Sequence, residues 1–177
     1  MKEACNIVSS LLACRKPIIA RINGDCLGLG SSVALMCDIT VIVEDAVIGD
    51  PHVKLGLTAG DGGALIWPQH IGFARAKEYL LTGDAVPAKL AAEIGLVNHA
   101  VPRDQLDDKV AEITKKLARA SGPAVQTTKM AINKVLQRNF DGLMEANLGL
   151  ETWVFLGEEH RNAVFALRDR WAKAKEG

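Results

Sequence analysis

A strand, a glycine-rich turn, a helix and a second strand follow one another near the N-terminus, and this succession most constrains the fold. Pro17 to Ile22 predicts a buried strand, and Asn23-Gly24 is a turn signal. Gly28-Leu-Gly-Ser-Ser32 then leads into an apolar helix, predicted from Val33 to Cys37. The β-branched run from Asp38 to Val43 predicts the second strand. Strands that alternate with helices in this way predict an α/β fold.

The second half of the chain is predicted to be helical from Arg103 onward. Apolar residues recur there at helical spacing, as in Leu106, Val110, Ile113 and Leu117. We therefore divide the chain into an α/β core, residues 1–102, and a helical region, residues 103–177. Only two or three strands can be recognised, too few for a sheet covered by helices, so we expect further strands before Met1.

Composition excludes several classes of protein. Among 177 residues, 21 are basic and 21 acidic, and no Lys/Arg run occurs, so neither a nucleic acid nor a membrane surface is an expected partner. The apolar runs are too short to span a bilayer, and the N-terminus does not resemble a signal peptide. The four cysteines have no CxxC spacing, so we expect free thiols, no metal and a cytoplasmic location.

Three features could carry chemistry. The turn at Gly28–Ser32 could present backbone N–H groups to an anion or a developing oxyanion, although it could equally be a tight turn without a ligand. His52 could be a general base, or a histidine with a structural hydrogen bond. Asp61, between Gly60 and Gly62, could work with His52 or simply cap the following helix.

Linked motifs resemble the crotonase (enoyl-CoA hydratase/isomerase) family. They occur in family order and spacing and are Lys16-Pro-Ile-Ile-Ala-Arg-Ile-Asn-Gly24, Gly28-Leu-Gly30, Ala34-Leu-Met-Cys-Asp38, Gly60-Asp-Gly-Gly63, Gly72–Gly83 and Glu93-Ile-Gly-Leu-Val-Asn98. The resemblance implies a crotonase-like ββα superhelix followed by a helical trimerisation region, with the N-terminal third of the family domain absent. It also implies a lyase of fatty acid metabolism that binds an acyl-CoA thioester, assembles as a homotrimer or hexamer, and needs no cofactor besides the coenzyme A of its substrate.

The resemblance also assigns site residues. The family's second oxyanion-hole donor, a backbone N–H, falls on Leu29, in a pocket that would include Gly28, Gly30, Ser32 and Gly60. On the last helix, Arg170 matches a basic residue that can reach a CoA phosphate in the family. A solvated charged face is the alternative for Arg170.

The chain departs from the family at its two catalytic glutamates, which align with Ser32 and His52. Hydration by two glutamates is therefore not expected, since serine is a poor base. His52 and Asp61 instead resemble the dyad of the 6-oxocamphor hydrolase-like β-diketone hydrolases, in which an aspartate orients a histidine that activates water. Those hydrolases have another histidine where this chain has Leu29. Three alternatives remain: an acyl-CoA enzyme using His52 and Asp61, a β-diketone hydrolase, and a catalytically impaired acyl-CoA-binding homologue.

Overall fold

Two small sheets form the centre of the computed structural model, which describes residues 2–176. The first sheet is parallel and has the strand order β1-β3-β6, and the second has the order β2-β4-β5 with β5 antiparallel. The strands are β1 (Ile19–Ile22), β2 (Cys26–Leu27), β3 (Ile39–Val43), β4 (Val47–Gly49), β5 (Val86–Pro87) and β6 (His99–Val101). Val41, Ile42 and Val43 of the central strand β3 are fully buried, as its β-branched composition predicts.

The predicted strands at 17–22 and 38–43 are confirmed as β1 and β3. The sequence revealed only part of the strands within this chain, because β2, β4 and β5 form a second sheet. These strands have only two or three residues each and exist through pairing with partners distant in sequence, such as Ile48 with Val86. No alternation pattern can be recognised over so short a run.

The helix after the glycine turn begins earlier than predicted. Helix α2 spans Leu29–Leu35, not Val33 to Cys37, because the turn is completed at Gly28. This glycine has φ 58° and ψ −131°, a conformation that side-chain-bearing residues avoid, and the chain can therefore pass from β2 into α2 within one residue. Ser31 and Ser32 are fully buried, so their small side chains allow α2 to pack closely on the core.

Helices cover and frame the sheets. They are α1 (Lys2–Ala13), α3 (Gly63–Thr82), α4 (Ala88–Glu93), α5 (Leu106–Arg119), α6 (Gly122–Phe140), α7 (Leu143–Phe155) and α8 (Glu158–Glu176), with the 3₁₀ helices η1 (His52–Leu55) and η2 (Arg103–Gln105). Helix α3 carries the Gly72–Gly83 motif up to Thr82, and Gly72 at φ 75° interrupts its helical geometry. The predicted helical tail is confirmed as α5 to α8.

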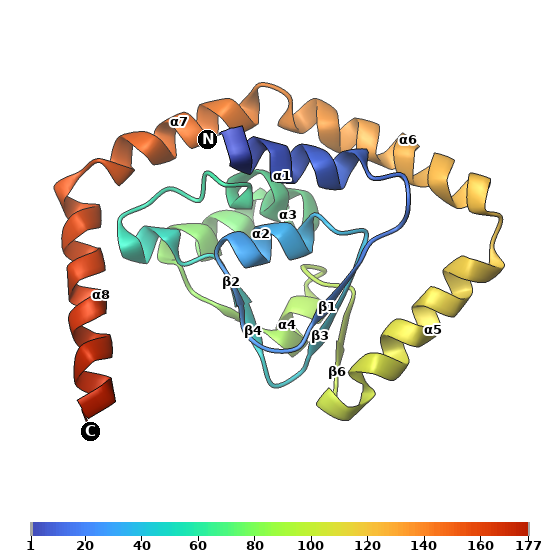
Figure 1. Cartoon of the computed structure of the whole chain (residues 1–177), viewed down its shortest axis with the longest axis horizontal. Helices are drawn as coiled ribbons and strands as arrows, with labels where there is room; N and C mark the ends of the chain where they lie inside the picture. Colours follow the sequence, from blue (N-terminus) through green and yellow to red (C-terminus); the bar gives the residue numbers. More distant parts are fainter. Residues whose placement is uncertain (1, 177) are drawn as a thin grey trace.

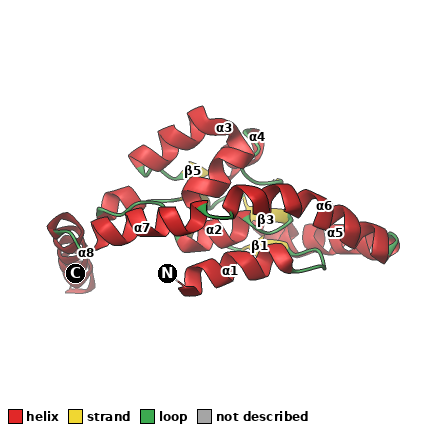
Figure 2. Cartoon of the chain, turned by 90° about the horizontal axis from the view of Figure 1, so that it is seen from above, coloured by secondary structure: helices red, strands yellow, loops and turns green. Residues whose placement is uncertain are grey.

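The tail runs around the core as an open frame (Figure 1). Helix α5 packs against β1 and β3, α6 against α1, α7 against α3, and α8 against η1. Figure 2 shows α1 and α3 on opposite sides of the layer that contains the sheet strands. Residues distant in sequence are thereby brought to the loop after β4. Within residues 2–176, no helix is long and apolar enough to cross a membrane.

Candidate active site

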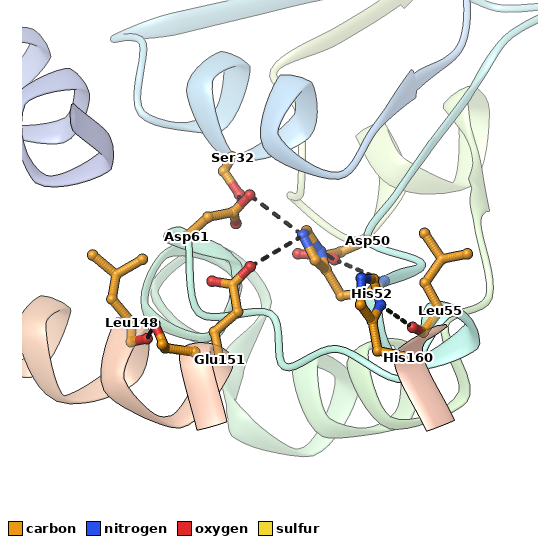
Figure 3. Close-up of polar contacts among 9 residues, drawn as sticks. Ser32, Asp50, His52, Leu55, Asp61, Leu148, Glu151 and His160 are labelled. Carbon is orange, nitrogen blue, oxygen red and sulfur yellow. Dashed lines mark hydrogen bonds and ion pairs between the residues drawn. The ribbon is translucent and has the colours of Figure 1, made fainter. Parts of the chain in front are cut away.

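His52 lies at the centre of a cluster of carboxylates (Figure 3). It is the first residue of η1 and directly follows Asp50-Pro51 at the end of β4. Its Nδ1 is in hydrogen-bond contact with Asp50 Oδ1, and its backbone N–H donates to the same oxygen at 3.3 Å. The side chain of Asp50 is completely buried. This carboxylate therefore holds a proton on Nδ1 and leaves Nε2 to face the opposite side.

The Nε2 atom of His52 faces Asp61, whose Oδ2 lies 3.5 Å away. Ser32 Oγ donates a hydrogen bond of 3.1 Å to the other carboxylate oxygen, Oδ1. The sequence suggested Asp61 either as the residue that orients His52 or as a direct acid or base. The geometry assigns the Nδ1 contact to Asp50, so Asp61 is instead a neighbour of Nε2.

Glu151 is the member of the cluster that sequence reasoning missed. It comes from α7, and its Oε1 lies 4.0 Å from His52 Nε2. The available signal was weak: Glu151 follows Met144 and Leu148 on one face of α7, and both of those residues are buried. An acidic residue on the buried face of an amphipathic helix needs a polar partner, but the sequence does not say which.

Gly60 leaves the space that Glu151 needs. A Cβ on Gly60 would lie 2.8 Å from the Glu151 carboxyl and 2.6 Å from the carbonyl oxygen of Asn147. The close approach of α7 to the loop before α3 therefore requires glycine here. Gly60 was predicted to belong to the substrate pocket, and in the structure α7 packs directly against it through Asn147 and Glu151.

The cluster shifts the pKa values of its members. Burial favours neutral His52, but the hydrogen bond to Asp50 and the charges of Asp50, Asp61 and Glu151 outweigh burial and raise the pKa of His52. Burial raises the pKa of Asp61, opposed by His52, by the Ser32 hydroxyl and by the Gly63 N–H. Burial and the charge of Asp61 likewise raise the pKa of Glu151. Each of the three groups therefore retains its proton to a higher pH than it would in solution.

The glycine turn lies beside the same imidazole. A Cβ placed on Gly28 would lie 3.6 Å from His52 Cε1, and Gly28 N–H donates to Gly49 O at 3.0 Å. Leu29 is the first residue of α2, where backbone N–H groups have no acceptor within the helix. Its side chain is 43% exposed. The structure thus brings Leu29, Ser32, His52, Asp61 and Gly60 into one region.

Two other predicted features stand apart from this cluster. Arg170 lies exposed on α8, where its Nε donates to the Ala166 carbonyl at 3.3 Å. Gly30 lies inside α2 with open space around it. Metal binding was not expected, although Asp50, His52 and Asp61 offer donor atoms within 4.8 Å of one another. The Asp50 contact already occupies Nδ1, and an imidazole between carboxylates suits proton transfer.

Comparisons with known proteins identify the fold and the family. The crystal structure of an enoyl-CoA hydratase/isomerase from Mycobacterium paratuberculosis superposes with a TM-score of 0.88 at 38% identity, over 93% of this chain and 66% of that one. A crotonyl-CoA hydratase of Syntrophomonas wolfei is 32% identical over 158 residues, which are 89% of this chain and 61% of that protein. A short-chain-enoyl-CoA hydratase of Clostridioides difficile is 33% identical over 154 residues, 87% of this chain and 99% of that protein.

The α/β core and its frame of helices therefore have the crotonase fold. The family model for enoyl-CoA hydratase/isomerase matches residues 1–170, and the chain belongs to that family. It spans slightly less than two thirds of the length of the mycobacterial enzyme and of the Syntrophomonas crotonyl-CoA hydratase.

Proposed function

We propose that this chain acts on an acyl-CoA thioester and stabilises its enolate, as an enoyl-CoA hydratase/isomerase-like lyase. The observation that carries the proposal is the position of His52, which has Asp50 on Nδ1 and lies beside the turn at Gly28. A base next to backbone N–H donors is the arrangement that enolate chemistry requires. The relatives named as hydratases support the same class of reaction.

In hydration, His52 Nε2 takes a proton from water while the water oxygen bonds to the β-carbon. The electron pair of the double bond moves through the α-carbon onto the thioester oxygen, and the Leu29 N–H donates to that oxygen. A proton added to the α-carbon completes the 3-hydroxyacyl thioester. Asp50 stabilises the imidazolium that forms in the first step, as a carboxylate does for a histidine base. The chemistry needs no cofactor beyond the coenzyme A of the substrate.

The family's two glutamates are replaced by Ser32 and His52, so this proposal does not use the family's two-glutamate mechanism. Ser32 has a different role, because its hydroxyl is buried and donates to Asp61. Arg170, exposed on α8, is proposed to contact a CoA phosphate, since guanidinium pairs well with phosphate.

Self-association as a homotrimer or hexamer is part of the proposal. Large apolar side chains are exposed along the last helices: Ile132, Val135, Leu143, Leu150, Trp153, Phe155, Leu156, Val164 and Phe165. Contiguous exposed apolar surface on a soluble domain is usually covered by a partner. Sedimentation of a monomer at micromolar concentration would contradict this part.

A second candidate is hydrolysis of a β-diketone, favoured by the carboxylates that flank both nitrogens of His52. Such an imidazole is a strong base for activating water. Cleavage of a cyclic β-diketone without coenzyme A would establish this reaction, and inertness toward it would remove the candidate.

The test of the first proposal is enolate formation from butyryl-CoA in deuterated water, followed by mass spectrometry. We expect deuterium at the α-carbon with the wild-type chain and a loss of about 10²–10⁴-fold in His52→Gln, the usual contribution of a general base. His99→Gln, which alters a histidine of β6, is the matched control and should exchange normally. Binding of butyryl-CoA without any exchange would identify the chain as a catalytically impaired acyl-CoA-binding protein.

A further inference from the structure

Glu151 places a second proton-carrying group next to His52. Its Oε1 is 4.0 Å from Nε2, the nitrogen that Asp61 also faces at 3.5 Å. The Glu151 side chain is only 18% exposed, so it is largely buried. Figure 3 shows the Glu151 carboxyl pointing toward His52 from the helix that carries Leu148.

Contacts on both sides hold this carboxyl in position. On one side, Asn147 and Glu151 pack against Gly60 so closely that a Cβ at this position would clash with both. On the far side of η1, His160 of α8 is hydrogen-bonded through Nδ1 to the Leu55 carbonyl at 2.7 Å. Since α7 packs on the loop at Gly60 and α8 packs on η1, which carries His52, the distance between acid and base is set by packing.

The two carboxyls near Nε2 differ in their hydrogen bonds. Asp61 accepts from the Ser32 hydroxyl and from the Gly63 N–H, which stabilise its anion. Glu151 Oε2 is buried and has no hydrogen-bond partner among the described residues. A proton shared between the two carboxyls is therefore retained on Glu151. Neighbouring carboxyls with unequal surroundings commonly divide acid and base roles in this way.

We propose that Glu151 is the general acid of the hydration, and that it delivers its proton to the α-carbon of the enolate. This inference rests on the proposed function and assigns the step for which the family's glutamates are missing. His52 Nε2 accepts the proton of water, and the O–H bond of Glu151 breaks as the α-carbon–hydrogen bond forms. The resulting imidazolium and carboxylate are neighbours, so the proton returns from Nε2 to Oε1 and restores both groups. No other reactant is needed.

A general acid must be protonated, and this requirement gives the proposal a signature in the pH profile. The titratable groups that face Glu151 among the described residues are His52 on η1, Asp61 before α3 and Asp50 after β4. Burial and the two aspartates raise the pKa of Glu151, while His52 lowers it. The hydration rate should consequently fall as pH rises through the pKa of this carboxyl, and the fall should depend on Glu151.

The experiment measures hydration of crotonyl-CoA across pH for wild type, Glu151→Gln, Glu151→Asp and the control Glu145→Gln. Glu145 is an exposed carboxylate on the same helix. We expect Glu151→Gln to lower kcat at least about tenfold with little change in KM, and to lose the basic limb of the profile. Glu151→Asp should keep that limb at a reduced rate, and it carries the test if the glutamine variant does not fold.

The outcomes separate the two proposals. An active wild-type chain with a Glu151→Gln variant of unchanged rate and unchanged basic limb overturns the role of Glu151 alone. A wild-type chain that neither hydrates crotonyl-CoA nor exchanges butyryl-CoA overturns the proposed function, and the role of Glu151 with it. Loss of activity in Glu145→Gln equal to that in Glu151→Gln would show a general effect of charge on α7 and would also overturn the assignment.

Discussion

The imidazole Nδ1 of His52 is hydrogen-bonded to the carboxylate of Asp50, two residues earlier in the chain. Pro51, between them, turns the chain from β4 into η1 and so brings the two side chains together. The carboxylate is fully buried and contacts both Nδ1 and the backbone N–H of His52. The short connection makes the contact local, so it can form as soon as η1 does. Asp50 thus fixes the orientation of the imidazole independently of the helices that later close over it.

Replacing Asp50 tests this orientation. Asp50→Asn removes the charge that raises the pKa of His52, so the acidic limb of the activity profile should move to lower pH. The maximal rate should fall at least about tenfold, because an amide no longer holds the proton on Nδ1. Rates of butyryl-CoA exchange across pH give both quantities. An acidic limb that stays in place would contradict the role of Asp50.

The contribution of the cluster around His52 to stability should fall as pH rises from the ordinary pKa values of the two carboxyls, 3.8 and 4.5, past that of His52, 6.5. The pKa values of His52, Asp61 and Glu151 are all raised in the folded chain, so the folded state binds more protons than the unfolded state. The His52 contribution is complete below its unfolded pKa and is lost as pH rises through the folded value. The two carboxyls act in the same direction, because each loses its proton as pH rises and its negative charge is then less stable in the buried site than in the unfolded chain.

Urea titrations at several pH values measure this slope. A His52→Gln/Glu151→Gln double variant should have a flatter dependence than wild type over the same range. An equal slope in both chains would show that the pH dependence arises outside the cluster.

Gly60→Ala should displace α7. The new methyl group would overlap Asn147 O and the Glu151 side chain, and overpacking of this kind costs about 1–3 kcal/mol of unfolding free energy. Hydration should fall as well, since the Glu151 carboxyl moves away from His52. Gly149→Ala is the matched control on α7, where a Cβ meets nothing within 4 Å. It should leave the rate unchanged and add about 0.5–1 kcal/mol of stability. Equal behaviour of the two variants in urea and rate measurements would contradict the packing argument.

The ion pair of Lys129 and Asp38 should be a major source of stability. Lys129 is 7% exposed, and its Nζ donates to Asp38 Oδ2 at 2.7 Å and to the Lys16 carbonyl at 2.9 Å. Lys129→Met leaves the Lys16 carbonyl without this donor, while Asp38, whose side chain is 22% exposed, still accepts from the Ile18 N–H. We therefore expect a loss of about 1–3 kcal/mol of unfolding free energy. Lys134→Met, exposed on the same helix, should change stability by less than about 0.5 kcal/mol. Similar urea midpoints for the two variants would show that the buried pair contributes little.

The sequence predicts the site where its parts are local. The turn at Gly28, the strands β1 and β3 and the histidine after Pro51 are encoded in short runs with clear propensities. Asp61 could be named because it lies between glycines nine residues after His52. These positions need no knowledge of tertiary packing.

Glu151 could not be predicted to join His52, because its role depends on how α7 is placed over Gly60. Nothing in the sequence near residue 151 encodes that contact. The same reason explains β2, β4 and β5, whose short runs become strands only when distant partners pair with them. The early start of α2 was missed for a local reason: the conformation of Gly28 completes the turn in one residue.

The packing of α7 on the loop at Gly60 also sets an order of assembly on the ribosome. Chains emerge from the N-terminus, and domains generally fold in that direction during synthesis. The strands, Asp50 and His52 are available while residues beyond Phe140 are still being added, so the base is formed before its acid. On the proposed mechanism, the nascent protein would hold an oriented imidazole without Glu151 and would gain hydration activity only after α7 has been released.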